Sequence, residues 1–395
     1  MITEIIMNQL HVKPKILVFI LNYLPGYKSG GVLRTIVNTV TWLSDDYEFW
    51  IVTRDRDLGS ELPYSEVRLN EWQSVEGAMV LYLPPESLNA KTLVKLILNT
   101  QHDLIHLNSY FDPVFTLRIM LARKFGWLPK SPLLLSPRGE FGEGSLRLKY
   151  AKKIIFIYFA KLFRLYNNAM FHATSEYELQ DIVGVLNPIG NSIKMALDLP
   201  SKVVEDLPNS PALSDQYLRI VFLSRLSREK NLDCVLRVLI QLNVKVIFDI
   251  YGPAEDAEYW RECQELIKRL PQNIIATYYG AVSPSQVSEI FSGYDLFFFP
   301  SKGENYGHVI AEAISVGTKV LISKNTPWLD LEADGLGWDV ELRDESVFID
   351  IIEEMAVERL DERLIKRAIV KQSALKRLMD PKVLNDNREL FRATT

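Results

Sequence analysis

The chain has 395 residues, of which 48% are hydrophobic and 24% are charged. At roughly 150 residues per domain it can form two or three domains with large cores, and its composition excludes disordered and collagen-like chains. The formal net charge of -5 argues against a surface that binds nucleic acid along its whole length. The two cysteines, Cys234 and Cys263, have no CxxC spacing, so the sequence predicts neither a disulfide framework nor a zinc site.

The first apolar stretch of the chain is short. Its longest uninterrupted run, residues 16–21, is far below the roughly 20 residues that a membrane span needs, and no cleavage site of small residues follows it. We therefore expect a cytoplasmic protein without a signal peptide.

Short apolar runs recur along the chain, most of them separated by enough residues for a helix. The first half contains KILVFILN, EFWIVTR, MVLYL, DLIHLN, LLLSPRG and MFHATS, and the second half contains RIVFLSR, KVIFDIYG, IIATYYG, DLFFFPS and KVLIS. Nearly continuous apolar strands are buried on both faces, which is typical of parallel sheets in α/β folds. Two such series predict an α/β protein with two doubly wound, Rossmann-like domains.

The boundary between the two series is predicted at residues 198–218, a stretch with three prolines and no sustained period. Residues 1–197 carry 21 Lys and Arg against 18 Asp and Glu, a net +3, whereas 198–395 carry 24 against 32, a net -8. We expect an N-terminal domain over 1–197, a linker over 198–218 and a C-terminal domain over 219–379. A last helix, about 380–395, is expected to cross back onto the first domain.

Ligands of an open parallel sheet bind beyond the carboxyl ends of its strands, which directs attention to the loops that follow them. The loop after the first strand contains Gly30 and Gly31, just before a helix expected from about Val32 to Ser44. Glycines at a helix N-terminus let backbone N–H groups approach a phosphate closely. A plain tight turn is the alternative interpretation of this pair.

A second loop, SRLSREKN, gathers Arg225, Arg228 and Lys230 after the strand RIVFL. Because the C-terminal half of the chain is negative overall, this local group of cations indicates a site for an anion. The alternative is a solvated helix start, in which Glu229 neutralises part of the charge.

The third loop, in PSKGENYGHVIAEAISVG, combines two carboxylates with a helix start. Glu304 lies in the loop, Gly307 allows close backbone approach, and Glu312 falls about one turn inside a helix expected over Val309–Val316. A helix N-terminus suits phosphate, and carboxylates suit vicinal hydroxyls such as those of ribose. A nucleotide sugar has both features; the alternative is a glutamate that only complements the helix dipole.

The ordered set of these segments resembles a known family. SRLSREKN, FDIYGP, YYGAVS, DLFFFPSKGENYGHVIAEAISVG, NTPW and GLGW together resemble the retaining glycosyltransferases of family 4, glycosyl transferases group 1. These enzymes have the GT-B fold, two doubly wound Rossmann-like domains facing a central crevice. Their two glutamates, separated by seven residues, are matched by Glu304 and Glu312. The resemblance is strong over about 219–340 and weaker, but in order, over 15–190.

The resemblance implies a role for each matching residue. Arg225 and Lys230 would hold the donor diphosphate, Glu312 the ribose hydroxyls and Glu304 the transferred sugar. The C-terminal domain would thus bind the donor and the N-terminal domain the acceptor. Further donor contacts are implied along the sugar and phosphates for Asn305, Tyr306, Gly307, His308 and Val309, beside the base for Gly252, Gly280, Ala281 and Val282, and over the diphosphate for Gly30 and Gly31.

The acceptor side departs from the family pattern, because many relatives carry a His-Gly pair where this chain has SPRGE. Arg138 stands in the place of the histidine, and an arginine is not a general base at neutral pH, so we expect it to orient a hydroxyl or a phosphate. His172 is interpreted as a structural histidine at a strand end. Asp55 and Asp57 form a DxD, but they follow the second strand, away from the donor loops, and we expect neither a metal nor another cofactor.

Taken together, the resemblance implies transfer of a sugar from a nucleotide-diphosphate sugar to a glycan or lipid-linked acceptor, with retention of the anomeric configuration. Polysaccharide or lipopolysaccharide synthesis is the expected context. Two alternatives are a non-catalytic two-domain protein that binds sugars or nucleotides, and a GT-B-like nucleotide-sugar epimerase.

The segment LRLKYAKKIIFIYFAKLFRLYNN contains six cations and no acidic residue. At 100° per residue, Lys149, Lys153, Lys161 and Arg164 fall within about 120° of one another on a helix. We expect this basic stripe to dock the N-terminal domain peripherally on the anionic cytoplasmic face of a membrane. The alternative is a core-packed helix with a solvated basic edge.

Overall fold

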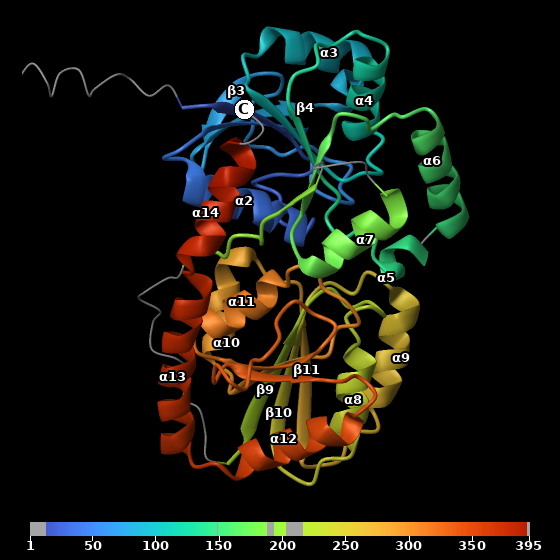
Figure 1. The fold of residues 1–395 in the computed structure, drawn as a ribbon. Coiled ribbons are helices and arrows are strands. Elements are labelled where there is room, and N and C mark those ends of the chain that lie inside the picture. Colours follow the sequence, from blue (N-terminus) through green and yellow to red (C-terminus); the bar gives the residue numbers. More distant parts are fainter. Residues whose placement is uncertain (1–12, 148, 188–192, 203–215, 393–395) are drawn as a thin grey trace, which may run out of the picture. The chain divides into compact units, whose positions relative to one another are not determined.

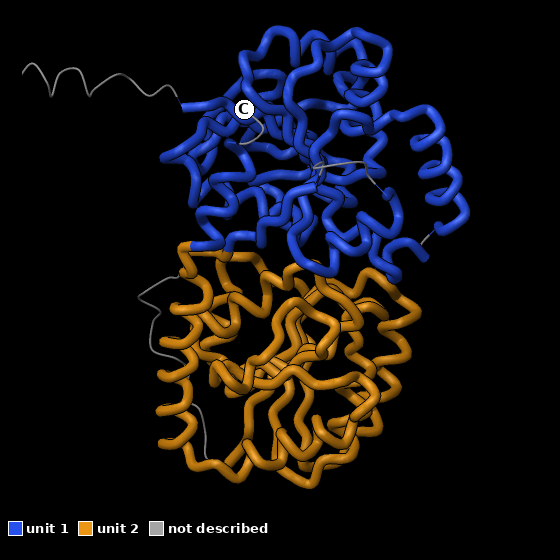
Figure 2. The backbone as a smooth tube through the Cα atoms, in the orientation of Figure 1, with its two compact units in different colours: residues 1–199, 382–395 blue, residues 200–381 orange. Residues whose placement is uncertain are grey.

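The computed structural model describes residues 13–147, 149–187, 193–202 and 216–392. The chain divides into two compact units, and Figure 2 colours them separately. Unit 1 contains residues 1–199 and 382–395, and unit 2 contains residues 200–381. The predicted linker falls for the most part on 203–215, outside the described residues.

Unit 1 is built on a twisted eight-stranded sheet with the order β3-β4-β2-β1-β5-β6-β7-β8. Its strands are β1 (Lys15–Phe19), β2 (Glu48–Arg54), β3 (Trp72–Val75), β4 (Ala78–Leu83), β5 (Leu104–Asn108), β6 (Leu133–Ser136), β7 (Met170–Ala173) and β8 (Ile193–Met195). All neighbours pair in parallel except β3, which runs antiparallel to β4. The expectation of a purely parallel sheet is therefore wrong at this edge.

Helices cover both faces of this sheet (Figure 1). A separate cluster of buried apolar residues lies on each face, between the sheet and its helices. They are α2 (Gly31–Leu43), η1 (Pro85–Ser87), α3 (Ala90–Asn99), α4 (Thr116–Lys124), α5 (Glu143–Arg147), α6 (Tyr150–Leu162), α7 (Glu176–Leu186) and α14 (Pro381–Arg392). No helix in the described part of the chain is long and apolar enough to span a membrane.

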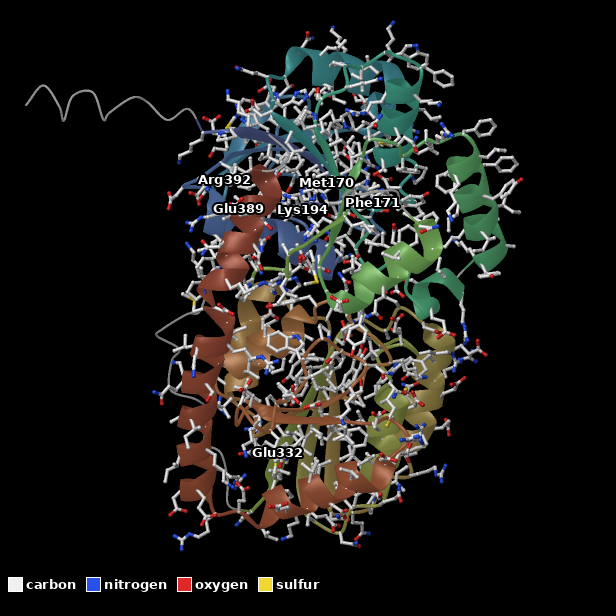
Figure 3. All side chains as sticks on the ribbon, viewed as in Figure 1. Met170, Phe171, Lys194, Glu332, Glu389 and Arg392 are labelled. Atoms are coloured by element: carbon white, nitrogen blue, oxygen red, sulfur yellow. The ribbon has the colours of Figure 1, made fainter. Side chains whose placement is uncertain are left out.

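The last helix, α14, packs on unit 1. Phe391 is 1% exposed, and its ring centroid lies 5.5 Å from that of Tyr47 and 5.9 Å from that of Phe49. At the polar edge of the helix, Arg388 Nε donates to Asp46 Oδ2 at 2.8 Å. Glu389 and Arg392, labelled in Figure 3, lie on the same helix. The core-facing residues of the helix recur seven positions apart, Val383 and Leu384 first and Leu390 and Phe391 two turns later, with the buried Asn387 between them.

Unit 2 has a six-stranded, fully parallel sheet with the order β11-β10-β9-β12-β13-β14. Its strands are β9 (Leu218–Leu223), β10 (Val246–Tyr251), β11 (Ile274–Gly280), β12 (Leu296–Phe299), β13 (Lys319–Ser323) and β14 (Gly337–Val340). The helices are α8 (Leu232–Ile240), α9 (Ala257–Ile267), η2 (Pro284–Gln286), α10 (Val287–Ser292), α11 (His308–Ser315), α12 (Glu345–Val357) and α13 (Leu360–Leu378). The four residues of β12 are fully buried, as a central strand requires.

Candidate functional site

The loops after β9 and β12 meet at the carboxyl edge of the sheet of unit 2. Because β9 and β12 are parallel neighbours, both loops leave the sheet on the same side. Asn231, buried and in the left-handed conformation, donates from Nδ2 to the Pro300 carbonyl at 2.9 Å. The backbone N–H of Lys302 donates to the Glu229 carbonyl at 2.8 Å. These bonds fix the two loops relative to each other.

This arrangement brings Lys230 and Glu304 together. Lys230 Nζ lies 2.5 Å from Glu304 Oε1, and their side chains are 14% and 11% exposed. Ser301 Oγ donates to the same carboxylate oxygen at 2.8 Å and is itself fully buried. A charged pair in this position offers a cation for phosphate and an acceptor for sugar hydroxyls, side by side at the surface of the unit.

The other two cations of the β9 loop are placed differently. Arg225 is half-exposed, and its Nη1 lies 3.5 Å from Glu255 Oε2. Arg228 points to α9, where it forms two hydrogen bonds with Glu262, at 2.8 and 2.6 Å. Arg225 is thus an accessible cation of the loop, whereas Arg228 is engaged outside the candidate site.

Gly252 joins the ends of three adjacent strands. Its φ is +134°, and a Cβ there would lie 1.7 Å from the Ser224 carbonyl oxygen, so no other residue fits without a backbone shift. Its N–H donates to the Gly280 carbonyl at 2.7 Å. The predicted base-side residues Gly280, Ala281 and Val282 therefore leave β11 directly beside Gly252, with Ala281 exposed.

The segment from Asn305 to Val309 forms the entry to α11. Gly307 is the N-cap, with φ +81°, and a Cβ there would meet Ile310 Cδ1 at 2.9 Å. Trp328 Nε1 donates to the Tyr306 carbonyl at 2.5 Å and holds the entry in place. His308 is buried at the start of the helix, and Glu312 lies in its second turn, half-buried. The positive end of the α11 dipole is thus next to the loop that contains Glu304.

In unit 1 the corresponding loop contains Gly30, with φ +68°, and Gly31, the first residue of α2. Asp57 anchors this loop, because its carboxylate accepts the backbone N–H groups of Tyr27 and Lys28 at 3.0 and 3.2 Å. The other carboxylate of the DxD, Asp55, accepts from Arg56. Asp57 thus holds the Gly30 loop, and Asp55 pairs with its neighbour Arg56.

Arg138 lies inside a buried polar network. Its Nη1 donates to Asp198 Oδ1 at 3.1 Å and its Nε to Asn108 Oδ1 at 3.0 Å, and both members of the ion pair have side chains only 4% exposed. Thr35 of α2 donates to the second oxygen of Asp198 at 2.7 Å. The network thus connects the SPRGE loop to the helix that follows Gly30 and Gly31. Within unit 1, the guanidinium is committed to these partners.

His172 has the structural environment expected from the sequence. Its Nε2 donates to the Ala196 carbonyl at 2.9 Å, and its Nδ1 lies 3.0 Å from Ser136 Oγ. Burial, reinforced by the nearby Arg138 guanidinium, lowers the pKa of His172 to about 4. The ring is therefore neutral at physiological pH.

The basic stripe expected on α6 is wrong as a single face. The helix begins after Lys149, its left-handed N-cap, and ends at Leu162, before Arg164. Lys153 points inward, donating to the Ser145 carbonyl at 2.7 Å, while Lys161 Nζ donates to the Val185 carbonyl at 2.6 Å. The four cations do not form one outward stripe, because the helix ends before Arg164 and the side chain of Lys153 turns inward.

Sequence reasoning missed several residues that position the site. Ser301 and Asn231 hold the β9 and β12 loops, and Asp198 holds Arg138. Glu140 is also buried, where it accepts from Ser109 Oγ and from two backbone N–H groups, and burial raises its pKa. The acidic residue in SPRGE was a visible signal, but its partners come from a loop about 30 positions away. Among the described residues, no group of three or more His, Cys, Asp or Glu could hold a metal ion.

Comparison with known proteins places this geometry in a class. The chain is 16% identical to Anabaena Alr3699/HepE, solved in complex with UDP-glucose, over 96% of this chain and 99% of that one, with a TM-score of 0.67. It is 13% identical to WaaG, a glycosyltransferase involved in lipopolysaccharide biosynthesis, over 91% and 95% of the two chains, with a TM-score of 0.63. The fold is GT-B, with two Rossmann-like domains, as predicted.

The sequence comparison then gives the family. Residues 203–371 match the family model for glycosyl transferases group 1, so this part of the chain belongs to that family and the resemblance seen in the sequence is confirmed. An uncharacterized 41.2 kDa protein in the cps region of Klebsiella pneumoniae is 24% identical over 281 residues, which are 69% of this chain and 74% of that protein.

Proposed function

We propose that the protein transfers a hexosyl group from a nucleotide-diphosphate sugar to a glycan or lipid-linked acceptor, with retention at the anomeric carbon. The observation that carries this proposal is the Lys230–Glu304 pair beside the α11 N-terminus in unit 2. The UDP-glucose complex of Anabaena Alr3699/HepE supports a nucleotide-sugar donor.

On the donor side, the cations of unit 2 complement the negative charge that develops on the leaving diphosphate. Breaking the bond between the anomeric carbon and the diphosphate places negative charge on the leaving phosphate, and fixed cations there lower the barrier. Lys230 and Arg225 supply these cations. Glu304, held by Ser301, accepts hydrogen bonds from hydroxyls of the transferred sugar, and Glu312 accepts from the ribose.

For retention, the acceptor hydroxyl attacks the face of the sugar from which the diphosphate leaves. The bond between the acceptor oxygen and the anomeric carbon forms as the bond to the phosphate oxygen breaks, and the acceptor proton passes to that phosphate oxygen. This route needs no protein base, which suits a chain with Arg138 in the place of the family's histidine.

No metal ion is needed in this proposal, because Lys230, Arg225 and the α11 N-terminus meet the phosphate charge. Full transfer activity is expected in EDTA. Loss of activity on chelation, with recovery on addition of Mn²⁺, would contradict this part of the proposal.

The acceptor is proposed to be an intermediate of envelope or extracellular polysaccharide synthesis. The support comes from the relative in the cps region and from the fold shared with WaaG. With such an acceptor, the proposed place of work is the cytoplasm, at the membrane face.

The test has two stages. The full chain is first heated with UDP, GDP, ADP and their sugars, because a ligand at 100 times its Kd stabilises a protein by about 2.7 kcal/mol. The stabilising donor is then incubated with lipid-linked glycans, and the product's anomeric configuration is assigned by NMR. A stabilising donor without transfer or epimerisation would favour the non-catalytic binding protein instead.

A further inference from the structure

Helix α6 exposes an apolar face. Its members have side chains between 38% and 63% exposed. We define the α6 apolar face as Ile154, Ile155, Tyr158, Phe159, Leu162 and Phe163. Side chains project from this helix on its outer side (Figure 3). Contiguous exposed apolar side chains on a water-soluble domain mark an interaction surface.

The opposite face of α6 makes the contacts that attach the helix to the core of unit 1. Ile157 and Ala160 are each 5% exposed and belong to the core of unit 1. Phe156 packs against the rings of Tyr110 and Phe111, at centroid distances of 5.9 and 5.8 Å. The outer apolar side chains are therefore not needed to attach the helix to unit 1.

The charge of this region is one-sided. Between Glu143 and Glu176 the sequence has no acidic residue. At 100° per residue, the five members of the apolar face that lie within the helix cover about 140°, from Ile154 to Phe159, and Phe163 is the C-cap that follows. Lys161 and Lys152 lie about 20° beyond the two edges of this 140°. Apolar side chains flanked by cations on both edges are typical of a helix that lies in an anionic lipid interface.

We propose that unit 1 docks on an anionic phospholipid bilayer by inserting the α6 apolar face among the headgroups, with Lys152 and Lys161 at the lipid phosphates. Lys161 donates one hydrogen bond to Val185 and keeps two N–H groups for a phosphate. This inference rests on the proposed function for the reason to approach a membrane. It replaces the basic stripe as the docking surface.

The charge pattern favours lipid over a second copy of the chain. In a two-fold contact through α6, the same surface of both copies would meet, and the lysines of one would face those of the other. No carboxylate between residues 144 and 175 is available to offset this repulsion. A phospholipid surface supplies the missing negative charge.

The experiment is co-sedimentation of the full chain with phosphatidylcholine vesicles, with and without phosphatidylglycerol. We expect binding that requires phosphatidylglycerol and falls about tenfold or more in the double variant Ile155→Ser with Phe159→Ser. The matched control is Ile365→Ser with Ile369→Ser, two exposed isoleucines at the same spacing on α13, which should bind like the parent chain. Lys152→Glu should also weaken binding to the vesicles that contain phosphatidylglycerol.

Three outcomes overturn the inference: no vesicle binding by the parent chain, equal binding by the α6 variant, or a dimer in solution that the α6 variant abolishes. A Tyr158→Trp variant adds a direct readout, because its fluorescence should shift to the blue on insertion and stay unchanged otherwise. Glu304→Gln should bind vesicles normally. The α6 variant should keep the thermal stabilisation by donor, so failure of this inference and failure of the proposed function are distinguishable.

Discussion

The two units place charged groups at their strand ends in opposite ways. In unit 2, Lys230 and Glu304 lie in surface loops with 14% and 11% of their side chains exposed, and Arg225 of the β9 loop is half-exposed. In unit 1, Arg138 and Asp198 are 4% exposed, and Asn108 and Thr35 take up further hydrogen-bonding capacity.

The difference in exposure indicates that the charged pair of unit 2 can bind a ligand, whereas the pair of unit 1 positions other residues. A pair that water reaches can exchange its partner for a phosphate or a hydroxyl at small cost. A closed pair cannot, because release of one partner leaves a buried charge uncompensated. Unit 2 therefore carries the groups for the donor, while the network of unit 1 fixes the α2 entry and the SPRGE loop.

The largest expected effect is on stability, in unit 1. Arg138→Ala should lower the free energy of unfolding by about 3–5 kcal/mol, because Asp198 would remain buried without its cation. Chemical denaturation measures this loss. Arg147→Ala, which removes an exposed ion pair with Glu143, should change stability little. If Arg138→Ala were as stable as the parent chain but had no transfer activity, Arg138 would be a substrate contact rather than a structural residue, and the difference drawn between the two units would be wrong.

The next effect is on turnover, in unit 2. Glu304→Gln should reduce transfer by roughly 10²–10³ while thermal unfolding stays close to that of the parent chain. The control is Glu262→Gln, whose partner Arg228 lies outside the candidate site. Normal steady-state rates for Glu304→Gln would show that the glutamate is not a sugar contact.

A smaller effect is expected at Ser301, a positioning residue. Ser301→Ala removes one hydrogen bond to the Glu304 carboxylate, worth about 1 kcal/mol, so turnover should fall by roughly fivefold. Ser301→Thr, which keeps the hydroxyl, should restore part of the loss if the added methyl fits. A loss as large as that of Glu304→Gln would instead indicate that Ser301 contacts the substrate.

Most of the strands could be predicted because a strand that is buried on both faces needs a run of apolar residues, which the local sequence shows. Runs such as LRIVFL and LFFF are apolar without interruption, as central parallel strands must be. The short edge strands β3, β8 and β14 were missed. WQSV and GWDV mix polar and apolar residues because edge strands are partly exposed, and IKM is only three residues long.

The site could be predicted only in part. The residue types and the order of Lys230, Glu304 and Glu312 were visible, and the resemblance supplied their roles. The partners were not visible, because Arg138 meets Asp198 across 60 positions and Lys230 meets Glu304 across 74. Contacts at such separations depend on strand order, which no local pattern contains.

The central claim is that unit 2 binds the donor diphosphate through Lys230. Calorimetric titration of the full chain with UDP, or with whichever of UDP, GDP and ADP stabilises it, tests this claim directly. We predict that Lys230→Ala weakens binding about tenfold or more, consistent with loss of a charge-assisted hydrogen bond worth roughly 1.5–3 kcal/mol, while Arg228→Ala binds like the parent chain. Equal affinity for Lys230→Ala and the parent chain would contradict the account.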